Sequence, residues 1–382
     1  MTRKNNSKII SVVRPICCGL DVHKKMVSAC IIFKANRNVI MTITIKLTNA
    51  CSIAKTKIMK RPMPMNAGSA SKSLGRLELL KRFLALSRTP HGLLDMATPA
   101  FAVLLYLGGF PPVHVVIIGL ITAFAGYTAV YALNDIIDFR TDMAKGGESV
   151  LTAENYLDSL MVRHPMAQGL LSFRQGIMWT AGWSLVALLG AYLLNPMCVV
   201  IFLLGAVLET VYCLLWHVSP WRSIVSGFVK NTGPLAALYA VDPHPSLFYM
   251  ILLFLGLFFW EIGGQNIPAD WSDIELDRQF KAKTIPVRLG VEKAASLALV
   301  SLSISIVLIS GLFMMRFPGW KWLASLSALA AGLYLLLIPV FKLRMTRNRE
   351  QAMALFNRAS YFPITLLCLT LVLIGLLKYG SF

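Results

Sequence analysis

Nine apolar runs, each close to the length of a membrane-spanning helix, occupy most of the chain after residue 90. A helix needs about 20 predominantly apolar residues to cross the hydrocarbon core of a bilayer. Only 14% of the 382 residues are charged, against roughly 25% in soluble domains. The sequence therefore predicts an all-α, polytopic membrane protein with nine transmembrane helices. The runs cover residues 92–110, 113–134, 174–194, 197–216, 222–241, 245–268, 294–315, 320–341 and 359–378.

The first 75 residues differ in composition from the rest of the chain. They hold 14 Lys and Arg against a single acid, Asp21, within a chain whose net charge is +19. We expect a basic, disordered N-terminal extension over residues 1–75 and one transmembrane domain over residues 76–382. The domain opens with an amphipathic segment, Leu77–Arg88, that we expect to lie at the membrane surface.

A short stretch of the extension, Cys18–Cys30 (CGLDVHKKMVSAC), resembles the opening strand of insertion-sequence transposases. In those proteins the Asp is one of several acids that bind metal, and no further acid follows Asp21 before Glu78. One carboxylate cannot build such a site, so we expect no nucleic-acid partner. The extension is interpreted as a fused remnant or as the product of a mis-set start codon. The alternative starts are Met59, Met63 and Met65.

Basic residues are concentrated in the loops that follow the even-numbered runs. Lys and Arg favour the cytoplasmic side of a membrane, so the pattern predicts a cytoplasmic N-terminus in a cell inner (plasma) membrane. The loops after odd-numbered runs carry only Arg316 and Lys321. The basic residues of the other loops are Arg140, Lys145, Arg163, Arg222, Arg278, Lys281, Lys283, Arg288, Lys342, Arg344, Arg347 and Arg349.

An acidic stretch, Asn134–Asp142 (NDIIDFRTD), ends the second apolar run on the predicted cytoplasmic side. At about 100° per residue, Asn134, Asp138 and Asp142 drift by only about 80° around a helix, so all three can face one way. Asp135 points about 100° away from Asn134 and is interpreted as a solvated residue.

A second acidic stretch, Asp270–Asp277 (DWSDIELD), ends the sixth run on the same side. Asp270, Asp273 and Asp277 fall within about 60° of one another on a helix, whereas Glu275 points about 140° away from Asp270. Two acidic clusters at one membrane face indicate a shared site. The alternative is that both are ordinary solvated helix ends.

Carboxylates at this spacing suit Mg²⁺, which takes hard oxygen ligands and bridges them to substrate phosphates. The predicted metal ligands are Asn134, Asp138, Asp142, Asp270, Asp273 and Asp277. The acids Asp138, Asp142, Asp273 and Asp277 are the predicted catalytic residues. Metal ions and nearby cations can then stabilise the charge that develops on a leaving diphosphate.

Several basic residues are candidates to contact that diphosphate. We predict substrate-binding roles for Asn134, Arg140, Arg163, Lys230, Arg278 and Lys283. Lys230 lies inside the fifth run, and a membrane-embedded Lys is functional by default. The alternative for Lys230 is a side chain that snorkels to the cytoplasmic surface. Two further intramembrane acids, Glu209 and Glu261, could orient an acceptor hydroxyl or pair with Lys230.

The two acidic stretches resemble the motifs of the UbiA superfamily of intramembrane prenyltransferases. The polar residues of the first stretch match the family pattern NxxxDxxxD, and Asp273 and Asp277 match DxxxD, with a further Asp upstream. The later TIPVRLG and the earlier RHPMAQGLLS are also family-like. The chain departs from the family at Leu276 and Lys281, where Gly is common, and at Trp216, where many members carry Lys.

The resemblance covers about residues 80–382 and implies a bundle of nine spans around a central cavity. It also implies Mg²⁺-dependent transfer of an isoprenyl group from a prenyl diphosphate to a lipophilic acceptor. We expect an aromatic acceptor similar to 4-hydroxybenzoate; the alternatives are a chlorin, haem or a glycerol-phosphate ether. The rival from another class is a multi-pass, cation-coupled transporter. The sequence does not indicate an oligomeric state.

Overall fold

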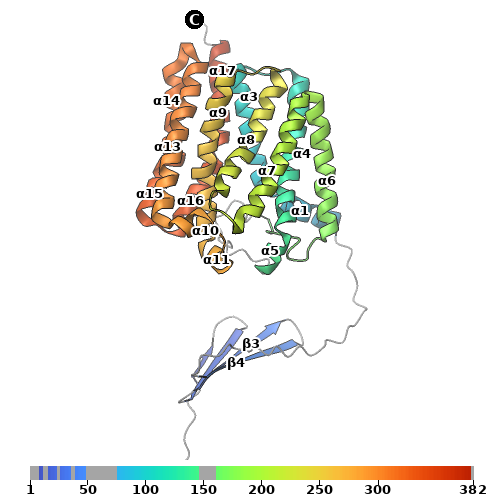
Figure 1. Cartoon of the computed structure of the whole chain (residues 1–382), viewed down its shortest axis with the longest axis vertical. Coiled ribbons are helices and arrows are strands. Elements are labelled where there is room, and N and C mark those ends of the chain that lie inside the picture. Colours follow the sequence, from blue (N-terminus) through green and yellow to red (C-terminus); the bar gives the residue numbers. More distant parts are fainter. Residues whose placement is uncertain are drawn as a thin grey trace, which may run out of the picture. The chain divides into compact units, whose positions relative to one another are not determined.

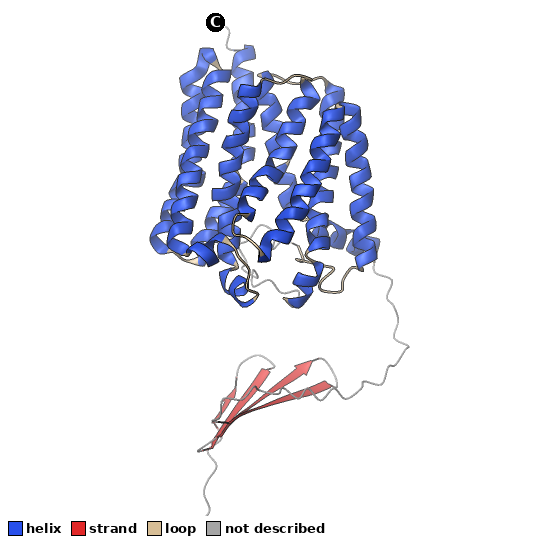
Figure 2. Cartoon of the chain, in the orientation of Figure 1, coloured by secondary structure: helices blue, strands red, loops and turns tan. Residues whose placement is uncertain are grey.

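Long apolar helices make up the chain from residue 75 onward (Figure 2). The computed structural model describes the backbone of residues 8–11, 16–23, 26–35, 39–48, 75–145 and 161–379, and the side chains of residues 75–145 and 161–378. The chain divides into two units, Met1–Lys72 and Ser73–Phe382.

The first unit contains four strands in the order β1-β2-β3-β4, all antiparallel. They are β1 (Lys8–Ser11), β2 (Ile16–His23), β3 (Met26–Ala35) and β4 (Val39–Thr48). The all-α class predicted for the whole chain therefore does not extend to these residues. The rest of the expected disordered extension lies outside the described residues, and its origin stays a prediction.

The second unit is helical, as predicted, and its α1 matches the expected amphipathic segment. In chain order its helices are α1 (Arg76–Leu86), α2 (Thr89–Asp95), α3 (Ala97–Leu107), α4 (Val113–Ile137), α5 (Phe139–Ala144), α6 (Phe173–Leu194), α7 (Pro196–Leu214), α8 (Arg222–Val241), α9 (Leu247–Trp260), α10 (Ile267–Ser272), α11 (Ile274–Gln279), α12 (Ile285–Leu289), α13 (Val291–Arg316), α14 (Lys321–Gly332), α15 (Ile338–Thr346), α16 (Arg349–Ser360) and α17 (Phe362–Tyr379). Two π-helical segments, η3 (Glu261–Asn266) and η5 (Leu333–Leu337), join α9 to α10 and α14 to α15.

Within the described residues, seven helical stretches are long and apolar enough to cross a membrane. The protein is therefore an integral, multi-pass membrane protein. Two of the nine predicted runs, 92–110 and 222–241, are not among the seven. The first falls on the short α3, and the second falls on α8, which carries Arg222 and Lys230. The count of nine spans stays a prediction.

Two groups of helices meet along α3 and α8. On one side α4 packs on α6, and α7 packs on α8; on the other, α13 packs on α9 and α14, and α17 packs on α14. Helix α3 contacts both α8 and α17, so the first part of the bundle closes against the last. Helices α5 and α11 lie at the same end of the unit, opposite the C-terminus (Figure 1). This end carries both acidic stretches.

Small residues allow the helices to approach closely, as is common where lipid gives no hydrophobic drive for association. A Cβ on Gly263, in the π-helical segment η3, would lie 2.8 Å from the carbonyl oxygen of Ala298 on α13. That oxygen belongs to backbone and cannot rotate away. The Trp260 indole, one turn earlier, donates to the Ala359 carbonyl oxygen at 3.0 Å, which ties the same segment to α16.

We predict that Gly263→Ala destabilises the helical unit by about 1–3 kcal/mol, because the added methyl overpacks the contact between η3 and α13. Gly311→Ala on α13 is the matched control, since nothing lies within 4 Å of its added Cβ. Loss of a helical Gly should leave that variant unchanged or up to about 1 kcal/mol more stable. Thermal unfolding of the detergent-solubilised protein measures both. Equal melting temperatures for the two variants would contradict this account of the packing.

Candidate active site

A cavity of about 530 Å³ opens inside the helical unit. Its wall includes every polar residue singled out in the two acidic stretches: Asn134, Asp138, Asp142, Asp270, Asp273 and Asp277. The two stretches are more than 120 residues apart in sequence. The fold therefore brings both predicted clusters to one site.

The first stretch keeps its helical phase through the end of α4. The backbone N–H of Asp138 donates to the Asn134 carbonyl at 2.9 Å, and that of Asp142 donates to the Asp138 carbonyl at 2.8 Å. Asp138 is the last residue of α4 in helical conformation and also begins α5. Because the hydrogen-bond ladder continues across this joint, the three side chains stay on one side, facing the cavity.

The second stretch follows the π-helical segment η3. Asp270 lies in α10, Asp273 separates α10 from α11, and Asp277 lies in α11. The backbone N–H of Asp277 donates to the Asp273 carbonyl at 2.8 Å, so these two carboxylates also share one face. The Thr284 hydroxyl donates to Asp277 Oδ2 at 3.0 Å and fixes that side chain.

Arg222, the first residue of α8, provides the buried positive charge beside the second stretch. Its guanidinium donates to Asp270 Oδ1 at 3.0 Å and to the Tyr212 hydroxyl at 2.8 Å. The Asn266 amide also donates to that hydroxyl at 3.1 Å. Arg222 thus has a fixed position at the cavity wall, with its charge close to the acidic cluster.

Arg88 and His164 hold the first stretch. Arg88 donates to Asn134 Oδ1 and Asp135 Oδ1, each at 3.1 Å. His164 Nδ1 lies 2.9 Å from Asp142 Oδ2 and 3.3 Å from Asp135 Oδ1. Burial favours a neutral imidazole, but the two carboxylates outweigh it and raise the pKa of His164. The two carboxylates therefore favour the charged form of His164.

A second set of contacts orients Asn134 from the opposite side. Its amide nitrogen donates to Glu209 Oε1 at 2.7 Å and to Cys213 Sγ at 3.3 Å, both on α7. The amide oxygen therefore points toward Arg88. Lys145 lies 3.7 Å from Asp142 Oδ1 and 4.0 Å from the centre of the Trp216 ring.

Two buried carboxylate oxygens in the second stretch have no hydrogen-bond partner among the described residues, namely Asp270 Oδ2 and Asp273 Oδ1. An unsatisfied buried acceptor costs about 1–3 kcal/mol, more when charged. Hard divalent cations bind such oxygens. The residues present therefore fit a divalent metal at this wall. In the first stretch, Asp135, Asp142 and His164 each offer a ligand atom within 4.8 Å of the others.

Three acids beyond the ends of the membrane-spanning helices, Asp138, Asp273 and Asp277, have raised pKa values. Burial, followed by the charge of Asp270, raises the pKa of Asp277 to about 7. Burial, followed by the charge of Asp142, raises the pKa of Asp138, and burial raises that of Asp273. A cation that binds the ionised oxygens would offset this penalty. The cluster therefore has the electrostatics of a site that needs added positive charge.

The predicted substrate-binding residues divide into two groups. Arg163 and Lys230 line the cavity along with Asn134. Arg140 and Arg278 are exposed, and neither they nor Lys283 lies on the cavity wall. The backbone N–H of Lys283 instead donates to the Trp216 carbonyl at 2.8 Å.

Several buried charged residues at or beside the cavity were not predicted from the sequence. Asp135, expected to be solvated, is 3% exposed and paired with Arg88 and His164. Arg222 was read only as a loop charge. Asp95 was overlooked, although an acid inside an apolar run is itself a signal of a functional group.

Comparisons with known proteins bear on the family and the fold of the chain. The sequence profile of the UbiA prenyltransferase family matches residues 96–361. A structure of a UbiA homolog from Aeropyrum pernix K1 is 19% identical, covering 74% of this chain and 97% of its own, with a TM-score of 0.58. No curated protein sequence matches significantly.

Two further solved structures are similar to the chain. A UbiA homolog from Archaeoglobus fulgidus bound to GPP and Mg²⁺ is 17% identical, covering 77% of this chain and 99% of its own, with a TM-score of 0.57. A digeranylgeranylglyceryl phosphate synthase is 15% identical, covering 78% and 99%, with a TM-score of 0.54. At these identities the likeness shows a shared fold.

We predict that Arg222→Met lowers the stability of the protein by about 3–5 kcal/mol, because it leaves the Asp270 carboxylate buried and unpaired. The matched control is Arg347→Met, which breaks a pair with Glu292 in which the two side chains are 48% and 73% exposed. An exposed pair contributes at most about 1 kcal/mol. Thermal unfolding in detergent compares the two, and similar losses would show that the buried pair is not structurally important.

Proposed function

The chain belongs to the UbiA prenyltransferase family, and we propose that it transfers an isoprenyl group from a prenyl diphosphate to a lipophilic aromatic acceptor, with Mg²⁺ as its cofactor. The observation that carries this proposal is the pairing of two buried acidic clusters on one wall of an otherwise largely apolar cavity. The acidic clusters supply a place for a diphosphate, and the apolar part of the cavity supplies a place for its hydrocarbon chain. An acceptor similar to 4-hydroxybenzoate remains the preferred substrate.

The metal ligands we propose are the oxygens of Asn134, Asp138, Asp142, Asp270, Asp273 and Asp277. The unpartnered oxygens of Asp270 and Asp273 support this assignment. These oxygens would hold Mg²⁺, and the bound metal would supply positive charge to offset the negative charge on a leaving diphosphate.

The chain's own cations would complete the diphosphate site. Arg222, Arg163 and Lys145 all line the cavity beside the acidic clusters. Arg222 is held rigidly by Asp270 and Tyr212, which suits preorganised stabilisation of a leaving group. Arg140 and Arg278 are exposed, so we propose for them a role in attracting the anionic substrate before it binds.

The apolar part of the cavity suits an isoprenyl tail. Side chains of α3, α4, α6 and α7 form this part of the wall, among them Val103, Leu120, Leu194 and Phe202. Each CH₂ group removed from water contributes about 0.8 kcal/mol. A dry cavity also protects an allylic cation from capture by water.

The proposed reaction uses these parts in sequence. The C1–O bond of the prenyl diphosphate breaks, and the diphosphate leaves with the electron pair while Arg222 and its neighbours bind it. An electron-rich carbon of the acceptor donates its electron pair to the resulting allylic C1, which forms the new C–C bond. Loss of a proton from that acceptor carbon then restores its aromatic ring.

We also propose that the acidic end faces the cytoplasm of a cell inner (plasma) membrane. Exposed basic residues gather around the acidic stretches, including Arg140, Arg278, Lys281 and Arg288. Lys and Arg in short loops favour the cytoplasmic side.

We expect Asp138→Asn and Asp277→Asn each to lower the rate of prenyl transfer by at least about 100-fold, because each removes an ionised oxygen from the diphosphate site. Glu275→Gln is the matched control: it lies in α11 between Asp273 and Asp277, but it is exposed and off the cavity wall. Transfer from radiolabelled geranyl diphosphate to a panel of acceptors, in membranes that contain each variant, measures the rate. Full turnover in both Asp variants would rule out the proposed site.

Removal of divalent metal should abolish tight binding of the diphosphate. Without Mg²⁺, the carboxylates of the two stretches repel an anionic ligand. Titration calorimetry with the unreactive analogue geranyl S-thiolodiphosphate, with Mg²⁺ and then with EDTA, is expected to show at least a tenfold weaker affinity in EDTA. Unchanged affinity would mean that the acids do not act through a metal.

A further inference from the structure

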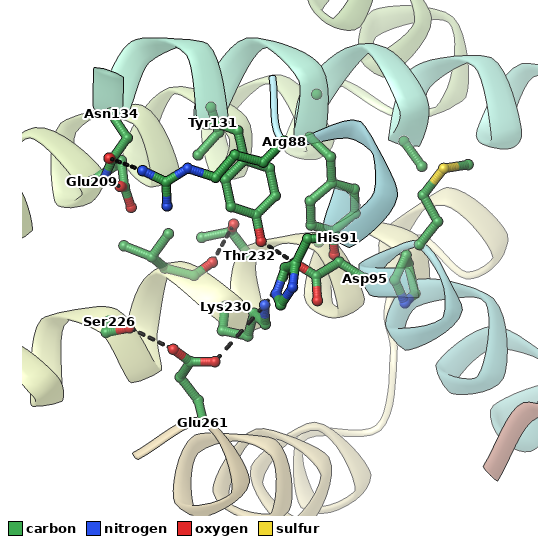
Figure 3. A pocket seen from close by; sticks show the side chains of 18 of the residues that line it. Arg88, His91, Asp95, Tyr131, Asn134, Glu209, Ser226, Lys230, Thr232 and Glu261 are labelled. Carbon is green, nitrogen blue, oxygen red and sulfur yellow. Dashed lines mark hydrogen bonds and ion pairs between the residues drawn. The ribbon is translucent and has the colours of Figure 1, made fainter. Parts of the chain in front are cut away.

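A second polar cluster lines the cavity away from the acidic stretches (Figure 3). It is centred on Lys230 of α8, which donates to Asp95 Oδ2 at 2.7 Å and lies 3.8 Å from Glu261 Oε2. The Tyr131 hydroxyl also donates to Asp95 Oδ2. We name these residues, with Ser226 and His91, the Lys230 cluster. The metal and diphosphate site described above does not use it.

The Lys230 cluster lies deeper in the bundle than the diphosphate site. Lys230 is eight residues beyond Arg222 along α8, a rise of about 12 Å. Glu261 precedes Asp270 by nine residues along the continuous η3 and α10 segments, so it is displaced in the same sense. The separation leaves room for a diphosphate and its reacting carbon between the two polar sites.

A carboxylate oxygen of the cluster lacks a hydrogen-bond donor among the described residues. Ser226 donates to Glu261 Oε1 at 2.7 Å, which fixes the carboxylate. The other oxygen, Oε2, is buried and has no hydrogen-bond partner in the part of the chain that the structure describes, and Glu261 as a whole is 7% exposed. A buried carboxylate oxygen in this state costs free energy until a donor reaches it.

Lys230 and Glu261 are spaced so that one hydroxyl group can bridge them. A distance of 3.8 Å between Nζ and Oε2 is too long for a direct hydrogen bond. An oxygen that lies beside both atoms, about 2.8 Å from each, can accept from the ammonium, which carries three donors, and donate to the carboxylate. A hydroxyl does both at once, whereas an ether oxygen or a carboxylate can only accept.

The charges and the aromatic walls of the Lys230 cluster further restrict the class of ligand that can bind there. Two carboxyl groups, Asp95 and Glu261, face Lys230 and His91, so a ligand carboxylate would lie beside two groups of its own kind, which disfavours an anion. Aromatic rings surround it: His91 stacks on Phe356 with centroids 5.5 Å apart and meets Tyr131 edge-on. All three line the cavity. Such walls favour a flat ring.

We propose that the Lys230 cluster is the acceptor subsite and that it recognises a neutral aromatic hydroxyl, placed between Lys230 Nζ and Glu261 Oε2. The inference rests on the proposed function, because it assigns the acceptor to the remaining polar part of that cavity. It makes the phenolic hydroxyl, and not a carboxylate, the group that determines which acceptor binds. Ser226 is a positioning residue that keeps Glu261 Oε2 directed into the cavity.

Three matched probes test this subsite on the full-length protein in detergent with Mg²⁺ and geranyl S-thiolodiphosphate. Methyl 4-hydroxybenzoate offers the hydroxyl, methyl 4-methoxybenzoate replaces it with an ether, and monomethyl terephthalate replaces it with a carboxylate. Calorimetry should show the phenol binding at least tenfold more tightly than either of the others, because only the phenol satisfies Glu261 without adding negative charge.

Glu261→Gln should reduce the preference for the phenol over the ether by about tenfold, because a hydrogen bond to a neutral acceptor is roughly half as strong as one to a carboxylate. Glu350→Gln, an exposed glutamate on α16, is the matched control and should keep the full preference. Melting temperatures of both variants check that each is folded. Ser226→Ala offers a second, milder test of the same preference, since it removes only the contact that orients the carboxylate.

The outcomes separate the two proposals. If the thiolodiphosphate fails to bind the wild-type protein with Mg²⁺, the proposed function falls, and the acceptor subsite falls with it. If the diphosphate analogue binds but the phenol does not bind, or shows no preference over the ether, only the acceptor subsite is wrong. An unchanged preference in folded Glu261→Gln would also overturn it.

Discussion

The pairing of buried charges is the constraint on which the rest of this structure depends. Acids at the depth of a membrane are costly unless cations or hydrogen-bond donors meet them. Here three buried acids have a cationic partner from a different helix: Asp270 has Arg222 from α8, Asp135 has Arg88 from the start of α2, and Asp95 has Lys230. These pairs fix the relative positions of helices that otherwise contact one another through apolar side chains. They also leave specific oxygens without partners, and those oxygens mark where ligands are needed.

Interruptions in the helices determine where the polar side chains of the cavity lie. The joint between α4 and α5 at Asp138, and the sequence of short helices α10 and α11, turn the chain at one end of the bundle while the backbone hydrogen bonds continue. The π-helical segment η3 also shifts the helical phase of the residues that follow it, and such segments occur frequently at functional sites. All of its residues are buried, and it carries Glu261 at one end and Asn266 at the other. One irregular segment therefore serves both the deep cluster and the diphosphate end.

Much of this could be predicted from the sequence, and the failures have physical causes. Helical phase alone places Asn134, Asp138 and Asp142 together, because the hydrogen-bond ladder is unbroken. Helical phase also puts Arg140 about 200° away from Asp138. This angle agrees with the exposure of Arg140 and could have predicted that its side chain lies off the cavity wall. The burial of Asp135 could not be predicted, because it depends on Arg88 and His164, which reach it from distant parts of the chain. The count of nine spans stays a prediction, because length and hydropathy together do not decide it for the short α3 and the charged α8.

The two polar sites of the cavity share their supporting helices, and this arrangement bears on how the reaction would be aligned. Helix α8 carries Arg222, Ser226 and Lys230 at intervals of four residues, so all three face the cavity in one line. Directly beside these side chains, η3 carries Glu261, which accepts from Ser226, and α10 carries Asp270, which accepts from Arg222. The two neighbouring elements thus each offer one group to the diphosphate end and one to the deep cluster. A rigid pair of elements of this kind would fix the distance between a bound diphosphate and a bound hydroxyl. Since reacting carbons must approach within about 3–3.5 Å, the spacing built into α8 would select acceptors by the distance from their hydroxyl to their nucleophilic carbon.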